Sequence, residues 1–306
     1  MTDGSPAVAR WIRRELASDP PRAPSLIVTV WGDALAPHGS EFWLATLFAL
    51  LAPFSINERA VRTGVYRLHR GAWLEPRAVG RRSRYRLTDT GAQGFELAFH
   101  RVYDSPFRRW NGEWQAVIVG SDAGGPALRK RVRDELAWAG FGRFAATTFL
   151  RPMRDDDAVE RIARSLDVRA ALTAFEARDA LQRALPDLRS RVESVWSLAE
   201  VAADYRRFVA RFGALAGARP DASPEQAFVV RTLLVHAYRR VRLRDPQLPR
   251  KLLAADWPGA AAHDTARSVY RAMLASSEAF VREVLASQHE PVPARRAPAS
   301  RFDRGA

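Results

Sequence analysis

The sequence contains no cysteine in 306 residues, so disulfide bonds, thiolate catalysis and thiolate zinc sites are all excluded. It also lacks a long hydrophobic run, since the longest, Phe42 to Phe54, is too short to cross a bilayer and is broken at Pro53. The first residues carry no apolar segment of the secretory type. We therefore expect a cytoplasmic protein without a membrane partner.

Patterns that carry catalysis or metal binding are missing as well. The six histidines are scattered, and neither H-E-x-x-H nor G-x-S-x-G occurs. The aspartates Asp155 to Asp157 suit a helix start, where carboxylates are stabilised by the helix dipole. The stretch "GSDAGGPALRK" lacks the spacing of a phosphate-binding loop and is read as a turn. These absences predict no catalytic residue, no bound metal and no cofactor, and thus a protein that is not an enzyme.

Acidic residues are scarce relative to basic ones. The chain has 48 Lys and Arg against 34 Asp and Glu, a formal net charge of +14 and a pI near 11.1. Such an excess predicts a polyanionic partner, although an arginine-rich codon usage would also produce it. The excess is clustered, because nine arginines but only one carboxylate, Glu75, lie between Arg59 and Arg86.

Two helices are predicted around the start of this cluster. The run 40–52 reads as one apolar helix with Ser40 as its N-cap, and 59–70 reads as a second helix that ends at Gly71. With about 100° between successive residues, Val61 and its neighbours form the buried side. The opposite half carries Arg59, Arg62, Thr63, Tyr66, Arg67 and Arg70. A solvated face normally mixes charges of both signs, but 59–70 contains no acid.

Two strand-like runs, 73–79 and 83–89, follow this helix and are joined by a "GRR" turn. An apolar helix, a basic helix and a basic hairpin in this order predict a winged helix-turn-helix. The basic helix suits the DNA major groove, where Arg59, Arg62, Thr63, Tyr66 and Arg67 would contact bases. The hairpin would contact phosphates through Arg81, Arg82 and Arg84. An inverted-repeat operator bound by a homodimer is expected, whereas an RNA-binding or scaffold protein that uses the same surface remains an alternative.

The rest of the chain changes character twice. Strand-like runs at 114–120, 144–152 and 167–177 alternate with helical ones, which predicts an α+β domain of ferredoxin-like type. From Ala180 onward the pattern is helical. One of these helices carries Arg231, His236, Arg239 and Arg240, a set that could hold an anionic ligand such as the ADP part of a CoA thioester. Alternatively, His236 packs beside Tyr238, and the arginines pair with Asp245, Asp256 or Glu278.

The predicted architecture is therefore α+β and multidomain. It comprises a flexible N-terminal extension, a winged-helix domain with a following linker helix, a ferredoxin-like middle domain, an all-helical C-terminal domain for ligand or dimer contacts, and a disordered basic tail. Their expected ranges are 1–22, 23–104, 105–178, 179–290 and 291–306.

Several long motifs in the same order resemble one known family. The stretch "PSLIVTVWGDALAPHGSEFWLATLFALLAPFSINERAVRTGVYRLHRGAWLEPRAVGRRSRYRLTDTG" is similar to the N-terminal domain of the PaaX-like regulators, repressors of phenylacetic acid catabolism. The stretches "RVYDSPFRRWNGEWQAVIV", "WSLAEVAADYRRFVARF" and "RTLLVHAYRRVRLRDPQLPRKLLAADWPGAAA" resemble their later domains. The resemblance implies a bacterial, nucleoid-associated repressor that binds operator DNA and is released by an aryl acyl-CoA such as phenylacetyl-CoA. An enzyme acting on a CoA ester or on nucleic acid is the alternative.

Overall fold

The chain divides into two compact units in the computed structural model. The structure describes residues 4–106, 110–121, 123–152, 156–178, 188–216, 221–290 and 301–302. The first unit comprises 1–105, 205–243 and 260–306, and the second comprises 106–204 and 244–259. This division differs from the expected succession of domains along the chain. The long C-terminal helices join the N-terminal elements, because α11 (Pro224–Arg242) packs against α2 (Ala23–Val30) and α5 (Asp89–Tyr103).

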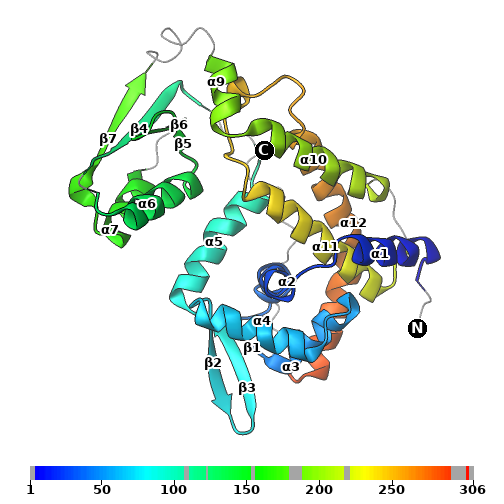
Figure 1. Cartoon of the computed structure of the whole chain (residues 1–306). Coiled ribbons are helices and arrows are strands. Elements are labelled where there is room, and N and C mark those ends of the chain that lie inside the picture. The colour runs from blue at the N-terminus through cyan, green and yellow to red at the C-terminus, as the bar shows by residue number, and fades with distance from the viewer. Residues whose placement is uncertain are drawn as a thin grey trace. The chain divides into compact units, whose positions relative to one another are not determined.

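Three of the helices in the N-terminal part of the first unit lie together with a small sheet (Figure 1). Helix α2 continues into the π-helical turn η1 (Trp31–Leu35) and packs against α4 (Glu58–Arg70), which also contacts α3 (Leu44–Leu51). The α2–α4 approach is close, since a Cβ on Gly64 would lie 2.7 Å from Cδ1 of Ile27. A larger side chain at position 64 would therefore push these two helices apart.

The sheet of this unit has the order β1–β3–β2, all antiparallel, and its strands are Glu41–Trp43, Arg82–Leu87 and Leu74–Val79. Gly80 turns the β2–β3 hairpin with a φ of 61°, a backbone conformation that favours glycine. The expectation of one helix over 40–52 was wrong at its start. Glu41 to Trp43 pair with β3, and α3 begins after Trp43 rather than after Ser40.

The first residues are not the flexible extension that the sequence predicted. Pro6–Ser18 form helix α1, which buries Val8, Trp11 and Glu15. The Trp11 ring lies 5.4 Å from that of Phe212, and Arg211 donates to Glu15 and Asp19. This extension folds because an apolar stripe on α1 covers α11 and the end of α10 (Leu198–Phe212).

The chain end also departs from the expected disordered tail. After the last helix, α12 (Gly259–Ser287), Arg301 and Phe302 are only 6% and 3% exposed. The remainder of the predicted tail, 291–300 and 303–306, lies outside the described residues. Among the described helices, none is both long and apolar enough to cross a membrane.

The second unit is an antiparallel sheet with helices on it. Its strands are β4 (Glu113–Val119), β5 (Gly142–Arg143), β6 (Thr148–Pro152) and β7 (Leu172–Arg178), in the order β5–β6–β4–β7. Helices α6 (Pro126–Trp138) and α7 (Asp156–Ser165) pack on the sheet through an apolar core that includes Val117, Val132, Leu136, Phe149 and Ile162. Helix α9 (Leu188–Val195) follows. The structure contains the three strands expected in this region and adds the two-residue strand β5.

Candidate nucleic-acid interface

Helix α4 turns its apolar side inward and its basic side toward solvent. Asn57 caps the helix by accepting a hydrogen bond from the backbone N–H of Ala60 at 2.9 Å. Val61, Gly64 and Val65 are buried, as the helical period predicts. All six predicted contact residues of this helix are exposed: Arg59, Arg62, Thr63, Tyr66, Arg67 and Arg70. Tyr66 is 62% exposed, an unusual position for a large aromatic side chain.

One carboxylate reaches the edge of this basic face. Glu58, just before the acid-free run, lies 3.2 Å from Arg62, whose guanidinium also stacks 4.7 Å from the Phe48 ring centroid. Both side chains of the ion pair are more than half exposed, so water screens the attraction. For Arg59 and Arg67, the described residues supply no carboxylate partner, and the face remains strongly cationic.

The β2–β3 hairpin lies beside α4 (Figure 1). Its exposed arginines add to the basic face of that helix. Arg81 at the turn is exposed, and Arg82 lies over the Trp43 ring at 4.3 Å while remaining exposed. Two acids offset part of the positive charge of the hairpin, because Glu41 pairs with Arg77 at 3.5 Å and Glu75 pairs with Arg86 at 2.6 Å. Arg81 and Arg82 are therefore the two hairpin arginines of the predicted set that face solvent.

Arg84 requires a correction, because it does not face a DNA partner as expected. Its side chain is 17% exposed and its Nη2 lies 2.7 Å from Oε2 of Glu290, a carboxylate with no exposed surface. The same nitrogen donates to the backbone oxygen of Glu41 at 2.8 Å. The side chain of Arg84 thus compensates a buried acid of the fold.

The predicted ligand-binding face of α11 also has a different role. Arg231, His236 and Arg239 contact, in turn, Asp33, Thr29 and Ser25 of η1 and α2. As the residue number rises along α11, the number of the partner residue falls from η1 into α2. This polar face is therefore the antiparallel seam between α11 and α2, and it binds that segment rather than an open site.

Arg231 is the most deeply buried member of this seam, with no exposed surface. Its Nε donates to Oδ2 of Asp33 at 2.7 Å, and its Nη2 donates to the Asp33 carbonyl at 3.0 Å. Its Nη1 reaches Ser277 at 2.9 Å and Glu278 at 2.5 Å. Pairing of Arg231 with Glu278, the alternative considered from the sequence, is thereby confirmed.

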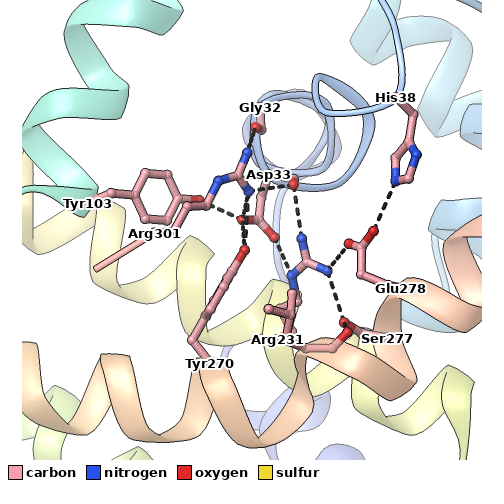
Figure 2. A network of polar contacts seen from close by, with 10 residues as sticks. Gly32, Asp33, His38, Tyr103, Arg231, Tyr270, Ser277, Glu278 and Arg301 are labelled. Carbon is pink, nitrogen blue, oxygen red and sulfur yellow. Dashed lines mark hydrogen bonds and ion pairs between the residues drawn. The ribbon is translucent and has the colours of Figure 1, made fainter. Parts of the chain in front are cut away.

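Asp33 is the centre of a polar network that joins η1 to α5, α11, α12 and the chain end (Figure 2). Its Oδ1 accepts hydrogen bonds from Tyr103 at 2.7 Å and Tyr270 at 3.1 Å, and Arg301 donates to the same oxygen. Burial raises the pKa of Asp33, but Arg231 and Arg301 more than offset this effect, so its pKa is lowered and it remains ionised. The ionised carboxylate in turn helps burial to raise the pKa of Tyr103.

The other predicted ligand residues differ in exposure and charge. Burial, aided by Arg239 and Arg240, lowers the pKa of His236 to about 3, so this imidazole is neutral near pH 7. Arg239 is largely buried and donates to Ser25 at 3.0 Å, whereas Arg240 is exposed and lies 3.5 Å from Asp19. His236 therefore adds no positive charge that could attract an anion.

Three adjacent family models match this chain and together cover most of it. They are the PaaX-like protein (residues 22–91), the PaaX protein central Cas2-like domain (108–189) and the PaaX-like protein C-terminal domain (196–283). The chain belongs to the PaaX-like family. The matched order agrees with the resemblance seen in the motifs.

Known relatives of this PaaX-like chain include the transcriptional repressor PaaX of Escherichia coli (strain K12). The two are 34% identical over 277 residues, which cover 89% of this chain and 87% of the relative. By this membership the chain belongs to a family of transcriptional repressors, DNA-binding regulators of transcription. The uncharacterised protein Rv0674 from Mycobacterium tuberculosis has a similar fold, with a TM-score of 0.53 and 24% identity over 87% of this chain and 98% of that one.

Proposed function

We propose that this chain is a bacterial transcriptional repressor that binds double-stranded operator DNA through a winged helix-turn-helix. The proposed domain consists of α2, β1, α3, α4 and the β2–β3 hairpin, with α4 as the recognition helix. The observation that carries the proposal is the outer face of α4, where four exposed arginines accompany the exposed Tyr66. The sequence similarity to a transcriptional repressor over most of the chain supports it independently.

The exposed side chains of α4 and the hairpin suit different parts of a DNA duplex. Arginine can donate two hydrogen bonds to guanine O6 and N7 in the major groove, and Thr63 or Tyr66 can contact a thymine methyl or a phosphate. The exposed Arg81 and Arg82 are proposed to contact flanking phosphates, which would add affinity without reading the sequence. Arg84 is omitted from this interface because it pairs with the buried Glu290.

A homodimer on an inverted repeat is part of the proposal. One recognition helix reads only a few base pairs, whereas two related by a two-fold axis read both halves of a palindrome. The mass of the complex with a selected duplex, measured by analytical ultracentrifugation, distinguishes one bound copy from two.

The chain order and the β5–β6–β4–β7 strand order of the second unit are those of a ferredoxin-like domain, and we assign that fold to it.

The proposed effector is an aryl acyl-CoA such as phenylacetyl-CoA, on the strength of the family resemblance. Release from DNA then requires that this thioester bind more tightly to a form whose recognition helices are misplaced. Two of the arginines predicted to bind the effector, Arg239 and Arg240, have no buried carboxylate partner among the described residues. Arg239 donates to Ser25, and Arg240 pairs with the exposed Asp19. Adding phenylacetyl-CoA to a preformed DNA complex tests the effector separately from DNA binding.

The DNA-binding proposal is tested by selecting duplexes from a random pool with the full-length protein. We expect enrichment of an inverted repeat, and weaker binding by Arg67→Ala. Arg131→Ala, an exposed arginine on α6, serves as the matched control for loss of one charge. Equal binding to A-form RNA, whose deep and narrow major groove excludes a helix, would favour the RNA-binding alternative.

A further inference from the structure

Phe302, close to the chain end, is buried inside a cage of aromatic rings. The ring centroids of Tyr103, Tyr270, His263 and Tyr238 lie 5.1, 5.3, 5.6 and 5.8 Å from that of Phe302. These rings come from α5, α11 and α12, and they leave Phe302 only 3% exposed. A phenyl group is therefore enclosed by elements that are far apart in the sequence.

The cage is held together by contacts that do not involve the Phe302 ring. Tyr103 and Tyr270 donate to Asp33, and the hydroxyl of Tyr238 lies 3.2 Å from Nδ1 of His263. Each tyrosine thus has a polar partner for its hydroxyl, and its ring carbons are left to line the cage. Burial and the nearby Arg242 lower the pKa of His263 to about 4, so the fourth wall is neutral near pH 7. The walls that enclose the Phe302 ring are therefore aromatic and uncharged near pH 7.

The neighbouring Arg301 is anchored separately from Phe302. Its guanidinium donates to Asp33 and to the Gly32 carbonyl, the latter at 3.1 Å, and it stacks 4.9 Å from the Tyr103 ring centroid (Figure 2). This contact balances the charge of Asp33. The Phe302 ring carries no charge, so another aryl group could replace it without leaving the carboxylate uncompensated.

We propose that this cage is the binding site for the aryl group of the effector and that Phe302 is its built-in competitor. The assignment rests on the proposed function for the identity of the effector. The side chain of phenylalanine is a phenyl ring on one methylene group, which is also the aryl end of a phenylacetyl thioester. A site that encloses one therefore has the shape and polarity to enclose the other.

Arg239 provides a donor for the acyl part of such a ligand. Its guanidinium is largely buried, and burial lowers its pKa, an effect that the nearby phenol of Tyr103 opposes. Within the described chain its hydrogen bonds go to neutral oxygens of Ser25 and not to a carboxylate. Arg239 directly follows Tyr238 of the cage on α11, and among the described residues its buried Nε has no hydrogen-bond partner. An acyl oxygen that reaches this nitrogen would be a suitable acceptor.

The position of the cage suggests how occupancy reaches the DNA-binding elements. Tyr103 lies on α5, which follows strand β3, and Asp33 lies in η1, which follows α2. Replacement of Phe302 by a larger ligand would move Tyr103 relative to Asp33 and so shift α5 against α2. The ligand would thereby favour a form in which α4 and the hairpin no longer fit one duplex.

The test measures binding of phenylacetyl-CoA and acetyl-CoA to full-length protein by isothermal titration calorimetry. If Phe302 competes with the aryl group, Phe302→Ala binds phenylacetyl-CoA at least about tenfold more tightly than wild type, because burying a phenylalanine side chain changes an equilibrium constant by roughly that factor or more. Affinity for acetyl-CoA, which has no ring, stays unchanged. The affinity of Phe302→Leu for phenylacetyl-CoA lies between those of wild type and Phe302→Ala. This variant keeps an apolar side chain at position 302 and so provides a second measurement if the alanine variant folds poorly.

Phe228→Ala is the matched control, since Phe228 is also fully buried between aromatic rings, those of Phe54 and Phe280. Phenylacetamide, a small neutral probe, should bind Phe302→Ala and not Phe228→Ala. The inference is overturned if the two variants bind the probe alike, or if Phe302→Ala gains no affinity for either aryl compound. If Phe302→Ala alone binds phenylacetamide while phenylacetyl-CoA leaves every DNA complex intact, the aryl site stands and the proposed effector is wrong.

Discussion

Nη2 of Arg84 in β3 donates to Oε2 of Glu290 at 2.7 Å, although the two residues are 206 positions apart in the sequence. Glu290 also accepts hydrogen bonds from the backbone N–H of Trp43 at 2.6 Å and from Thr46 at 2.8 Å. Trp43 is the N-cap residue of α3, and Glu290 accepts from its N–H as the glutamate of a capping box would, but from a distant segment. One carboxylate thus ties the sheet and the start of α3 to the end of α12.

Arg84→Met should therefore destabilise the fold rather than weaken DNA contacts directly. It leaves the fully buried Glu290 without its cation, which costs about 3 kcal/mol in the free energy of unfolding. Urea denaturation measures this loss. Arg81→Met, at the exposed hairpin turn, should change the free energy of unfolding by less than about 0.5 kcal/mol. Equal stability of the two variants would show that the Arg84–Glu290 pair contributes nothing.

Arg62 and Arg82 should affect DNA binding in different ways. Arg62→Ala should cost about 1–3 kcal/mol on the selected duplex and relax the preference at one base pair, because α4 is assigned to the major groove. Arg82→Ala should weaken binding to every duplex alike and reduce the slope of log K against log salt by about one. Fluorescence anisotropy with specific and random duplexes at several salt concentrations measures both effects. Identical behaviour of the two variants would refute this assignment of roles.

The exposed face of α4 could be predicted from the sequence because it depends on local geometry. The helical period alone places Arg59, Arg67 and Tyr66 opposite Val61 and Val65, and the structure has the same arrangement. Strand β1 was missed because its residues are apolar enough for a helix. Its identity depends on pairing with β3, about 40 residues further along the chain, as in Glu41 with Arg86.

Of the acidic partners of the buried arginines, the sequence indicated only Glu278, as one of three candidates, and it did not indicate Asp33. Arg231 and Arg301 both bind Asp33, but no periodicity relates these positions, and the sequence shows only that arginines are abundant. An arginine on a surface and one in a buried ion pair are indistinguishable by composition. Helix α1 was missed as well, although Val8 and Trp11 lie on one helical face.

Arg231→Met should lower the free energy of unfolding by about 3–5 kcal/mol, because it leaves Asp33 and Glu278 buried with one cation fewer. Arg231→Lys should not restore stability, since a lysine ammonium cannot reproduce the forked set of donors that reaches Asp33, Ser277 and Glu278. Thermal unfolding measures both. As a control, Arg240→Met removes a charge from the exposed side of the same helix and should change stability little. A lysine variant as stable as wild type would contradict the importance of the fork.

Trp11→Ala tests whether α1 belongs to the folded core. The change removes a ring that is 7% exposed and packs against Phe212, which should cost about 3 kcal/mol in the free energy of unfolding. It should also expose α1 to limited proteolysis. Arg10→Ala, an exposed position of the same helix, is the control. Unchanged stability and proteolysis in Trp11→Ala would return the segment to the flexible extension that the sequence suggested.

Acid sensitivity should follow from the two buried histidines of α11 and α12. The pKa of His236 is lowered to about 3 by burial and by Arg239, Arg240 and Arg211, against the opposing Asp19, and that of His263 is lowered to about 4 by burial and by Arg242. Both imidazoles bind protons more readily in the unfolded chain, whose histidine pKa is about 6.5. Their contribution to stability is therefore complete above that pH and is lost as the pH falls toward the folded-state values. Well below pH 6.5, each of the two histidines should lower the free energy of unfolding by about 1.4 kcal/mol per pH unit.

Urea unfolding of the wild type between pH 7.5 and pH 5 should show this decline, and His236→Gln should make it shallower by one histidine. His289→Asn, which removes an exposed histidine, is the control variant. His236→Gln loses stability at pH 7 if the contact with Thr29 matters, but its pH dependence is a separate readout, because a neutral amide takes up no proton over this range. A slope equal to that of wild type would mean that His236 takes up its proton as readily in the folded protein as in the unfolded chain. Below about pH 6.5 the buried contact between α11 and α2 would then hold a third positive charge beside Arg231 and Arg239.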